Sequence, residues 1–298
     1  MIRRLASTSS LLGAAMGLGL GLYATRRAPA RLVVTRYTLT LPRWPDELDG
    51  VLLTVIADLH IGCARGSDWS SPALTAAVEA VRAAEPDLLL VAGDFGFTRW
   101  NPHELGRAAD LFEATARVAV LGNHDYARGA KCARALTEAL SARGFAVLAN
   151  EAHRVVVRGH PLWVAGLDDG TSGRADFAKM LGTLRPAAHP VILLSHSPDA
   201  VTGAPAGVFD LAVAGHTHGG QIAIPAFNPL ELRKWARTKF DRGFYCVNGI
   251  PLFVTKGLGM VGHHARFRSR PEVVLLRMRS PRGQSELAGR SSGSPSEG

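Results

Sequence analysis

The sequence is poor in cysteine, and this scarcity excludes a fold held together by a framework of disulfides. Its 298 residues include three cysteines, Cys63, Cys132 and Cys246, without Cys-x-x-Cys spacing. At most one pair could form, and we expect free, mostly buried thiols. An internal repeat is also missing, and we interpret the chain as one globular domain with a different segment at each end.

Acidic residues are also fewer than basic ones. Lys and Arg together number 34 against 25 Asp and Glu, which gives a formal net charge of +9. The surface should therefore attract anions such as phosphorylated substrates, acidic membrane or nucleic acid, and the sign of the charge does not choose among them. With 47% hydrophobic residues the chain can bury one sizeable core, and we assign the domain to residues 31–279.

A long hydrophobic run is missing at the N-terminus. The apolar stretch Leu11–Ala24 has fourteen residues, fewer than the ~20 that cross a bilayer as a helix. Arginine pairs at 3–4 and 26–27 flank it, so the positive-inside rule gives no orientation. We expect residues 1–30 to be a signal peptide or an N-terminal membrane anchor, with an amphipathic or disordered leader as the alternative. Residues 280–298, rich in Ser, Gly and Pro, are expected to be a disordered tail.

Between these ends, apolar runs alternate with helix-like segments, a pattern typical of an α/β fold. The strands predicted are Val33–Leu41, Val51–Ala57, Asp87–Ala92, Val118–Leu121, Ala146–Ala149, Arg154–Val157, Leu162–Ala165, Val191–Leu194, Leu211–Ala214 and Pro251–Val254. The helices predicted are Thr75–Ala84, with its start near Ser71 and Pro72, Leu105–Ala116, and Lys131–Arg143, which ends at Gly144.

Five of these strands are followed by residue types that bind metals. The sequences at their carboxyl ends are Asp-Leu-His, Gly-Asp, Gly-Asn-His-Asp, Ser-His and Gly-His-Thr-His. The ligand candidates that they contain are Asp58, His60, Asp94, Asn123, His196, His216 and His218. Ligands in α/β sheets bind at this edge, because the loops that leave it converge there. Each piece alone would be interpreted as a loop residue or a core histidine, but five in succession favour a functional site.

The donor types in this set fit a pair of divalent cations. In an extended segment residues i and i+2 point the same way, so Asp58 and His60 could hold one ion. Asp94 has two carboxylate oxygens and could bridge two ions. Imidazole nitrogens suit Mn, Zn or Fe better than Mg or Ca. Two such ions would lower the pKa of a shared water and neutralise charge during phosphoryl transfer, so metal-activated hydroxide could cleave a phosphoester or pyrophosphate bond.

The ordered set of motifs resembles the calcineurin-like metallophosphoesterase superfamily over roughly Leu39–Glu272. The resemblance implies a four-layer αββα sandwich with a dinuclear metal site at the carboxyl ends of the strands. The superfamily's ligand scheme assigns Asp58, His60 and His218 to the first ion. It assigns Asn123, His196 and His216 to the second ion, with Asp94 as the bridge between the two.

The same resemblance gives His124 and Asp125 catalytic roles. His124 would face the substrate, where it stabilises charge or protonates the leaving oxygen, and Asp125 would orient its ring. The alternative for Asp125 is a turn or helix-capping residue. Purple acid phosphatases of the superfamily place an iron-binding Tyr three residues after the bridging Asp. Phe97 stands at that position here, which excludes a tyrosinate-bound ferric site.

Within the superfamily, the motifs around Asn123 and His216 and the apolar leader resemble a membrane-associated bacterial branch that includes lipid A precursor hydrolases. The branch is similar to enzymes that cleave the pyrophosphate of UDP-2,3-diacylglucosamine or lipid phosphoesters. This implies a phosphorylated, lipid-linked substrate and a chain that is membrane-associated or exported across the cytoplasmic membrane. The segment Pro225–Gly243 interleaves aromatic and basic residues, which is typical of contact with an anionic membrane surface. The alternative for that segment is a packed surface helix.

Three other functions compete with this interpretation. A phosphodiesterase or phosphatase that acts on small nucleotides is the main alternative. A nuclease is less favoured, because DNA-processing relatives add a capping or dimerisation domain and few residues follow Gly257, so nucleic acid is not an expected partner. A non-catalytic scaffold is disfavoured because every ligand position keeps its residue type.

Overall fold

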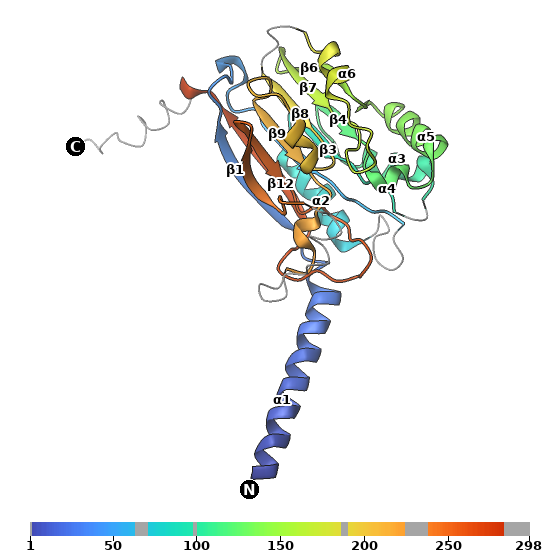
Figure 1. Cartoon of the computed structure of the whole chain (residues 1–298), viewed down its shortest axis with the longest axis vertical. Coiled ribbons are helices and arrows are strands. Elements are labelled where there is room, and N and C mark those ends of the chain that lie inside the picture. The colour runs from blue at the N-terminus through green and yellow to red at the C-terminus, as the bar shows by residue number, and fades with distance from the viewer. Residues whose placement is uncertain (1, 63–70, 98–99, 186–189, 224–237, 283–298) are drawn as a thin grey trace, which may run out of the picture.

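The computed structural model describes residues 2–62, 71–97, 100–185, 190–223 and 238–282. Within these ranges the strands form two six-stranded sheets (Figure 1). The first sheet contains, in spatial order, β1 (Val33–Thr40), β12 (Glu272–Arg279), β2 (Leu52–Ile56), β3 (Leu88–Ala92), β4 (Ala116–Val120) and β5 (Phe145–Leu148). The second contains β10 (Gly243–Val247), β11 (Ile250–Val254), β9 (Leu211–Ala214), β8 (Val191–Leu194), β7 (His160–Gly166) and β6 (Glu151–Val157).

Both sheets are mixed. Strands β2, β3, β4 and β5 are parallel to one another, and so are β7, β8, β9 and β11. Strand β12 joins β1 in parallel and β2 antiparallel, while β6 and β10 are antiparallel edge strands of the second sheet. The parallel strands therefore end at one edge of each sheet, where the predicted ligands follow them.

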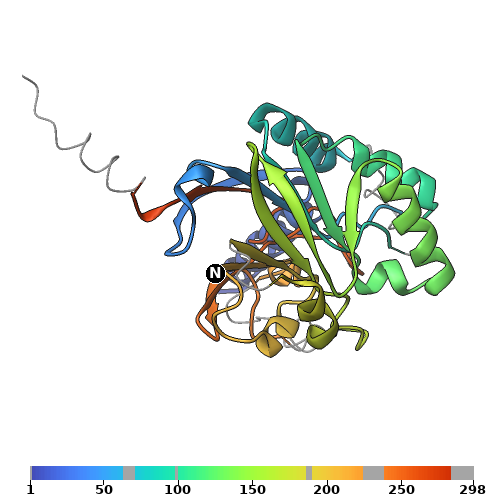
Figure 2. The same cartoon turned by 90° about the horizontal axis from the view of Figure 1, so that it is seen from above.

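Helices cover the outer faces of the sheet pair. Helices α2 (Pro72–Ala84), α3 (Pro102–Asp110) and α5 (Ala130–Ser141) pack on the first sheet, and α6 (Phe177–Thr183) packs on the second with the turn Asp199–Gly203. Figure 2 shows the teal and green helices on one side of the strands and the short olive and gold helices on the other. The predicted αββα sandwich is confirmed.

The continuous apolar run of β2 is explained by burial on both of its faces. Leu53 and Val55 point into the core between the two sheets, whereas Leu52 and Ile56 point into the layer of helices. Alternate residues of a strand face opposite sides, so a strand between two apolar layers is apolar at nearly every position, and the buried Thr54 is the exception in β2. The prediction of buried strands therefore holds for the central strands.

Helix α3 differs from its prediction. The expected helix Leu105–Ala116 begins earlier and ends earlier, at Pro102–Asp110. The side chain of Asn101 accepts a hydrogen bond of 2.8 Å from the backbone N–H of His103, which fixes the start of the helix. Ala116, expected at its end, is the first residue of β4.

Several elements were not predicted, and β12 matters most because it lies between β1 and β2. Strand β10, helix α6 and the short helix α4 (Asn123–Tyr126) were missed as well. Among the cysteines, Cys132 is half-buried and Cys246 exposed, and both are free thiols. The expectation of burial is therefore wrong for Cys246, while Cys63 lies outside the described residues.

The leader forms a helix, α1 (Ile2–Leu22), which is followed by a π-helical turn, Tyr23–Arg27. Figure 1 shows α1 projecting from the domain. No helix in the described part of the chain is long and apolar enough to cross a membrane. The expected disordered tail lies mostly outside the described residues, because the description ends at residue 282.

Candidate metal centre

The seven predicted ligands converge where β2, β3, β4, β8 and β9 end, but not through extended backbone. Asp58 and His60 have left-handed φ angles of 52° and 47°, so the extended geometry predicted for this pair is wrong. Asp94, His216 and His218 also have positive φ angles, of 56°, 71° and 52°. Non-glycine residues rarely adopt such angles, and each costs on the order of 1 kcal/mol or more. The chain turns sharply at each strand end, and these turns bring the side chains together.

One donor group contains Asp58, His60 and His218, all buried. The Nε2 atoms of His60 and His218 lie 3.0 Å apart. Oδ1 of Asp58 lies 4.0 Å from Nε2 of His60 and 3.8 Å from Nε2 of His218. Three donor atoms therefore converge on one small buried volume.

A second donor group contains Asp94, His196 and His216. Nε2 of His196 lies 3.4 Å from Oδ2 of Asp94, 3.1 Å from Nδ1 of His216 and 3.1 Å from Oδ1 of Asn123. The same Oδ2 of Asp94 is 3.5 Å from Nε2 of His60. The carboxylate of Asp94 therefore lies between the two groups, as a bridging ligand must.

Burial keeps most of these imidazoles neutral. It lowers the pKa of His60 to about 3 and that of His216 to about 4, because a charged ring is disfavoured away from water. Burial also raises the pKa of the Asp58 carboxyl to about 7. Neutral imidazoles have a free nitrogen lone pair, which is the form that binds cations.

His196 and Asp94 form a buried pair in which charge attraction exceeds the cost of burial. Burial acts to lower the pKa of His196, but the neighbouring Asp94 raises it to about 10. Burial acts to raise the pKa of Asp94, and the His196 ring lowers it overall. Nδ1 of His196 donates to the carbonyl oxygen of Ala92 at 2.8 Å, so Nε2 is the nitrogen that faces the other donors, and a metal ion that binds there would displace its proton.

These residues fit divalent cations. The Nε2 atoms of His60 and His218 lie 3.0 Å apart and are buried beside carboxylates, so several lone pairs face one small volume. A cation between them would satisfy the lone pairs of both groups. The nitrogen and oxygen donors suit transition metals such as Mn, Zn or Fe.

His124 lies beside the two groups. Its half-buried ring is 4.9 Å from the ring of His60 and 4.7 Å from the ring of Phe97, measured between centroids. Its backbone N–H donates to Oδ1 of Asp94 at 2.9 Å. Phe97 therefore presents a hydrocarbon ring where purple acid phosphatases place a tyrosine, and the ring of His124 lies closer to it than the ring of His60, which is 5.4 Å away.

Asp125 does not orient the ring of His124. Its two buried carboxylate oxygens accept hydrogen bonds of 3.0 Å each, one from the backbone N–H of Gly96 and one from that of Gly122. Among the described residues, no hydrogen bond joins it to the imidazole of His124. Asp125 instead caps α4 and ties the loop after β4 to the loop after β3, which corrects the predicted role in favour of the capping alternative.

Gly257 packs directly against the first donor group. Its φ angle is +64°, and a Cβ atom at this position would lie 2.6 Å from the Cβ of Asp58. The loop that contains it also bonds to Asp58, whose carbonyl oxygen accepts the N–H of Gly259. A glycine is required here because both the angle and the contact exclude a side chain.

Arg266 is a residue of this region that the sequence did not indicate. It is fully buried and donates to the carbonyl oxygens of Gly259, Ser269 and Lys256 at 3.1, 2.9 and 3.0 Å. Its Nη2 lies 3.4 Å from Nδ1 of His218. Burial lowers its pKa to about 10, so it stays cationic at neutral pH. Nothing in the sequence separates it from the arginines two and four residues later.

Replacing Arg266 with methionine should destabilise the protein by roughly 3–5 kcal/mol, because several buried carbonyl groups lose their donor. We expect thermal unfolding about 10 °C or more below that of the parent. Arg107→Met on the exposed face of α3 provides the control and should unfold within a few degrees of the parent. Equal melting temperatures for the two variants would show that Arg266 does not hold this loop.

Comparisons with known proteins agree with this geometry. A profile of the family described as "Calcineurin-like phosphoesterase" matches residues 51–220. The chain is 26% identical to "Uncharacterized metallophosphoesterase YkuE" of Bacillus subtilis, over 87% of this chain and 89% of that one. It is 25% identical to "Phosphodiesterase YaeI" of Escherichia coli, over 93% and 98%. It is 28% identical to "Transmembrane protein with metallophosphoesterase domain" of Danio rerio, over 86% and 60%.

Proposed function

Since the chain belongs to the calcineurin-like phosphoesterase family and is a phosphoester hydrolase, we propose that its substrate is a lipid-linked phosphoester or pyrophosphate such as UDP-2,3-diacylglucosamine. The observation that carries the chemistry is the position of Asp94. One oxygen of its carboxylate lies 3.5 Å from His60 and 3.4 Å from His196, within reach of both donor groups.

The residues of the site have different proposed roles. Asp58, His60 and His218 would hold one divalent cation; Asn123, His196 and His216 would hold the other, with Asp94 between them. When bound, two cations supply positive charge to the phosphoryl oxygens and lower the pKa of a water. The buried donors exclude bulk water, which strengthens these interactions. His124, only half-buried, would meet the substrate and hold or donate a proton at the leaving oxygen.

A membrane location supports the choice of a lipid substrate. The side chains of Leu12, Met16 and Leu18 on α1 are 72%, 67% and 66% exposed, and apolar side chains in that position favour contact with lipid. A relative named as a transmembrane protein is in line with this location. We propose that the chain is membrane-associated or exported across a bacterial cytoplasmic membrane.

The predicted membrane segment Pro225–Gly243 adds little support. Most of it, including Trp235, lies outside the described residues. At its described end, the ring of Phe240 packs on Tyr245 at 5.0 Å and Arg242 donates to the carbonyl oxygen of Gly219 at 2.9 Å. These two side chains are engaged in the fold, which favours the packed alternative for that end.

A substrate panel tests the proposal. With purified protein and Mn²⁺, UDP-2,3-diacylglucosamine in mixed micelles should be hydrolysed with a kcat/KM at least ~10-fold above that for UDP-N-acetylglucosamine, because two acyl chains add apolar contact area. Cyclic nucleotides serve as the competing substrates and bis-p-nitrophenyl phosphate as the positive control. If cyclic nucleotides are preferred and the acyl chains bring no gain, the lipid proposal fails and the small-nucleotide alternative replaces it.

A further inference from the structure

A cavity of about 490 Å³ lies at the base of α1, apart from the two donor groups. Its walls come from the π-helical turn, from the start of β1 and from the loop that precedes β12. The lining residues are Tyr23, Val33, Lys256, Phe267, Arg268 and Arg270. Neither the predicted ligands nor His124 belong to it, so the proposed chemistry leaves its role open.

The walls of this cavity are fixed to each other. The backbone N–H of Arg266 donates to the carbonyl oxygen of Ala24 at 2.9 Å. The rings of Tyr23 and Phe267 meet edge to face with centroids 6.3 Å apart. The N–H of Val33 donates to the carbonyl oxygen of Pro271 at 2.8 Å. The base of α1 therefore has a defined position on the domain, and the cavity is part of that junction.

The cavity carries uncompensated positive charge. Nζ of Lys256 lies 2.8 Å from Oε1 of Glu272 and is already paired. In the described ranges no ion pair is found for Arg268 or Arg270, and each is at least partly exposed. Guanidinium groups bind phosphate oxygens through two parallel hydrogen bonds. The chemistry of the lining therefore favours a phosphate-bearing anion.

The surface next to the cavity indicates the source of that phosphate. Along α1, exposed apolar side chains up to Leu22 give way to Tyr23 and then to the basic pair Arg26 and Arg27. In a helix that lies in a membrane surface, apolar side chains contact the acyl chains, whereas aromatic and basic side chains lie among the headgroups and their phosphates. A free phosphate ion would not contact the apolar and aromatic side chains of this helix and turn.

We propose that this cavity binds the phosphate headgroup of an anionic membrane lipid, with Arg268 and Arg270 as the principal ligands and α1 lying in the adjacent bilayer surface. The site rests on the membrane location proposed above and is separate from the metal centre. It shares a loop with that centre, because Lys256 precedes Gly257, which packs on Asp58. A bound headgroup would therefore hold the metal centre beside the membrane surface.

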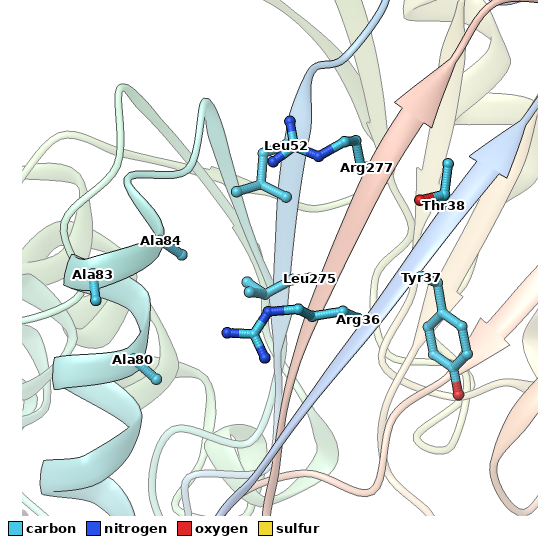
Figure 3. Close-up of a pocket in the computed structure, with 9 residues that line it drawn as sticks. All are labelled: Arg36, Tyr37, Thr38, Leu52, Ala80, Ala83, Ala84, Leu275 and Arg277. Atoms are coloured by element: carbon cyan, nitrogen blue, oxygen red, sulfur yellow. The ribbon is translucent and has the colours of Figure 1, made fainter. Parts of the chain in front are cut away.

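Vesicle flotation of the full chain tests the site. The variant Arg268→Gln with Arg270→Gln should bind vesicles of phosphatidylcholine with 30% phosphatidylglycerol about 30-fold more weakly than the parent, as two basic contacts each worth ~1 kcal/mol would predict. The matched control is Arg36→Gln with Arg277→Gln, which removes the same charge at another cavity, of about 470 Å³, between β1, β12 and α2 (Figure 3). The control should weaken binding less than about threefold, through long-range charge alone.

The outcomes separate this inference from the proposed function. Equal losses in the two double variants, or no loss in either, would overturn the headgroup site. Binding of millimolar inorganic phosphate to a parent that does not float with the vesicles would overturn the lipid as occupant in favour of the free ion. Hydrolysis of bis-p-nitrophenyl phosphate and the melting temperature should stay at the parent level in both variants. A parent that floats but does not hydrolyse lipid substrates would refute the proposed substrate and leave the headgroup site standing.

Discussion

Replacing Asp94 with asparagine should reduce hydrolysis by at least ~10³-fold and weaken both metal ions together. The substitution keeps the shape of the side chain but removes the negative charge that both donor groups share. An amide oxygen can still accept the N–H of His124, which Asp94 accepts at 2.9 Å, so the fold of the loop should survive. Loss of the two ions in parallel is the distinctive expectation, because no other predicted ligand lies between the two groups.

Metal content by mass spectrometry and kcat/KM on bis-p-nitrophenyl phosphate measure this effect. Asp110→Asn is the matched control, because Asp110 pairs with Arg117 on the surface with half of its side chain exposed, and such pairs contribute little. The control should keep two ions and full activity. A variant at Asp94 that retains two ions at the parent affinity would contradict the bridging role.

Replacing His124 with asparagine should lower turnover by ~10²- to 10⁴-fold while metal content stays nearly unchanged. The reason is its placement: the residue is half-buried, beside His60 and Phe97, so it stays partly accessible next to the donor groups. If the ring protonates the leaving oxygen, the loss should shrink for p-nitrophenolate, which leaves without a proton. An equal loss for all leaving groups would favour electrostatic stabilisation of the phosphoryl group instead.

His153→Asn on the exposed edge strand β6 is the control for this prediction and should leave turnover unchanged. Metal analysis also tests whether His124 is itself a metal ligand. Donor atoms of His124, His60 and Asp94 lie within 4.8 Å of one another, so the ring could itself hold a cation. Loss of one ion in the His124 variant would make it a ligand and would overturn its assignment to the substrate.

The left-handed turns place backbone strain at the ligands. Asp58, His60, Asp94, His216 and His218 all have positive φ angles, and together they store several kcal/mol of strain by the usual cost of about 1 kcal/mol or more each. The rigid strands β2, β3 and β9 on which they stand hold them in place. Such strain is typical of sites whose donor atoms are arranged before the ligand arrives.

Much of the architecture follows from the sequence by itself. The apolar runs that end at Ala57, Ala92 and Ala214 identify central strands, because a strand buried on both faces is apolar at nearly every position. The polar residues after those runs identify the carboxyl edge as the site, since loops converge there. Both inferences depend on local patterns, and local patterns are present in the chain before it folds.

Other features were decided only by the tertiary structure. Strand β12 takes its place between β1 and β2 through pairing with residues more than 200 positions away, and no local pattern encodes that distance. Asp125 caps α4 instead of orienting the ring of His124, because the fold places the backbone N–H of Gly96 within hydrogen-bonding distance of its carboxylate. Arg266 is buried, whereas Arg268 and Arg270 line a cavity at the base of α1. The three arginines alternate along one segment, so only their surroundings in the folded chain could assign one to the interior and two to the wall of a cavity.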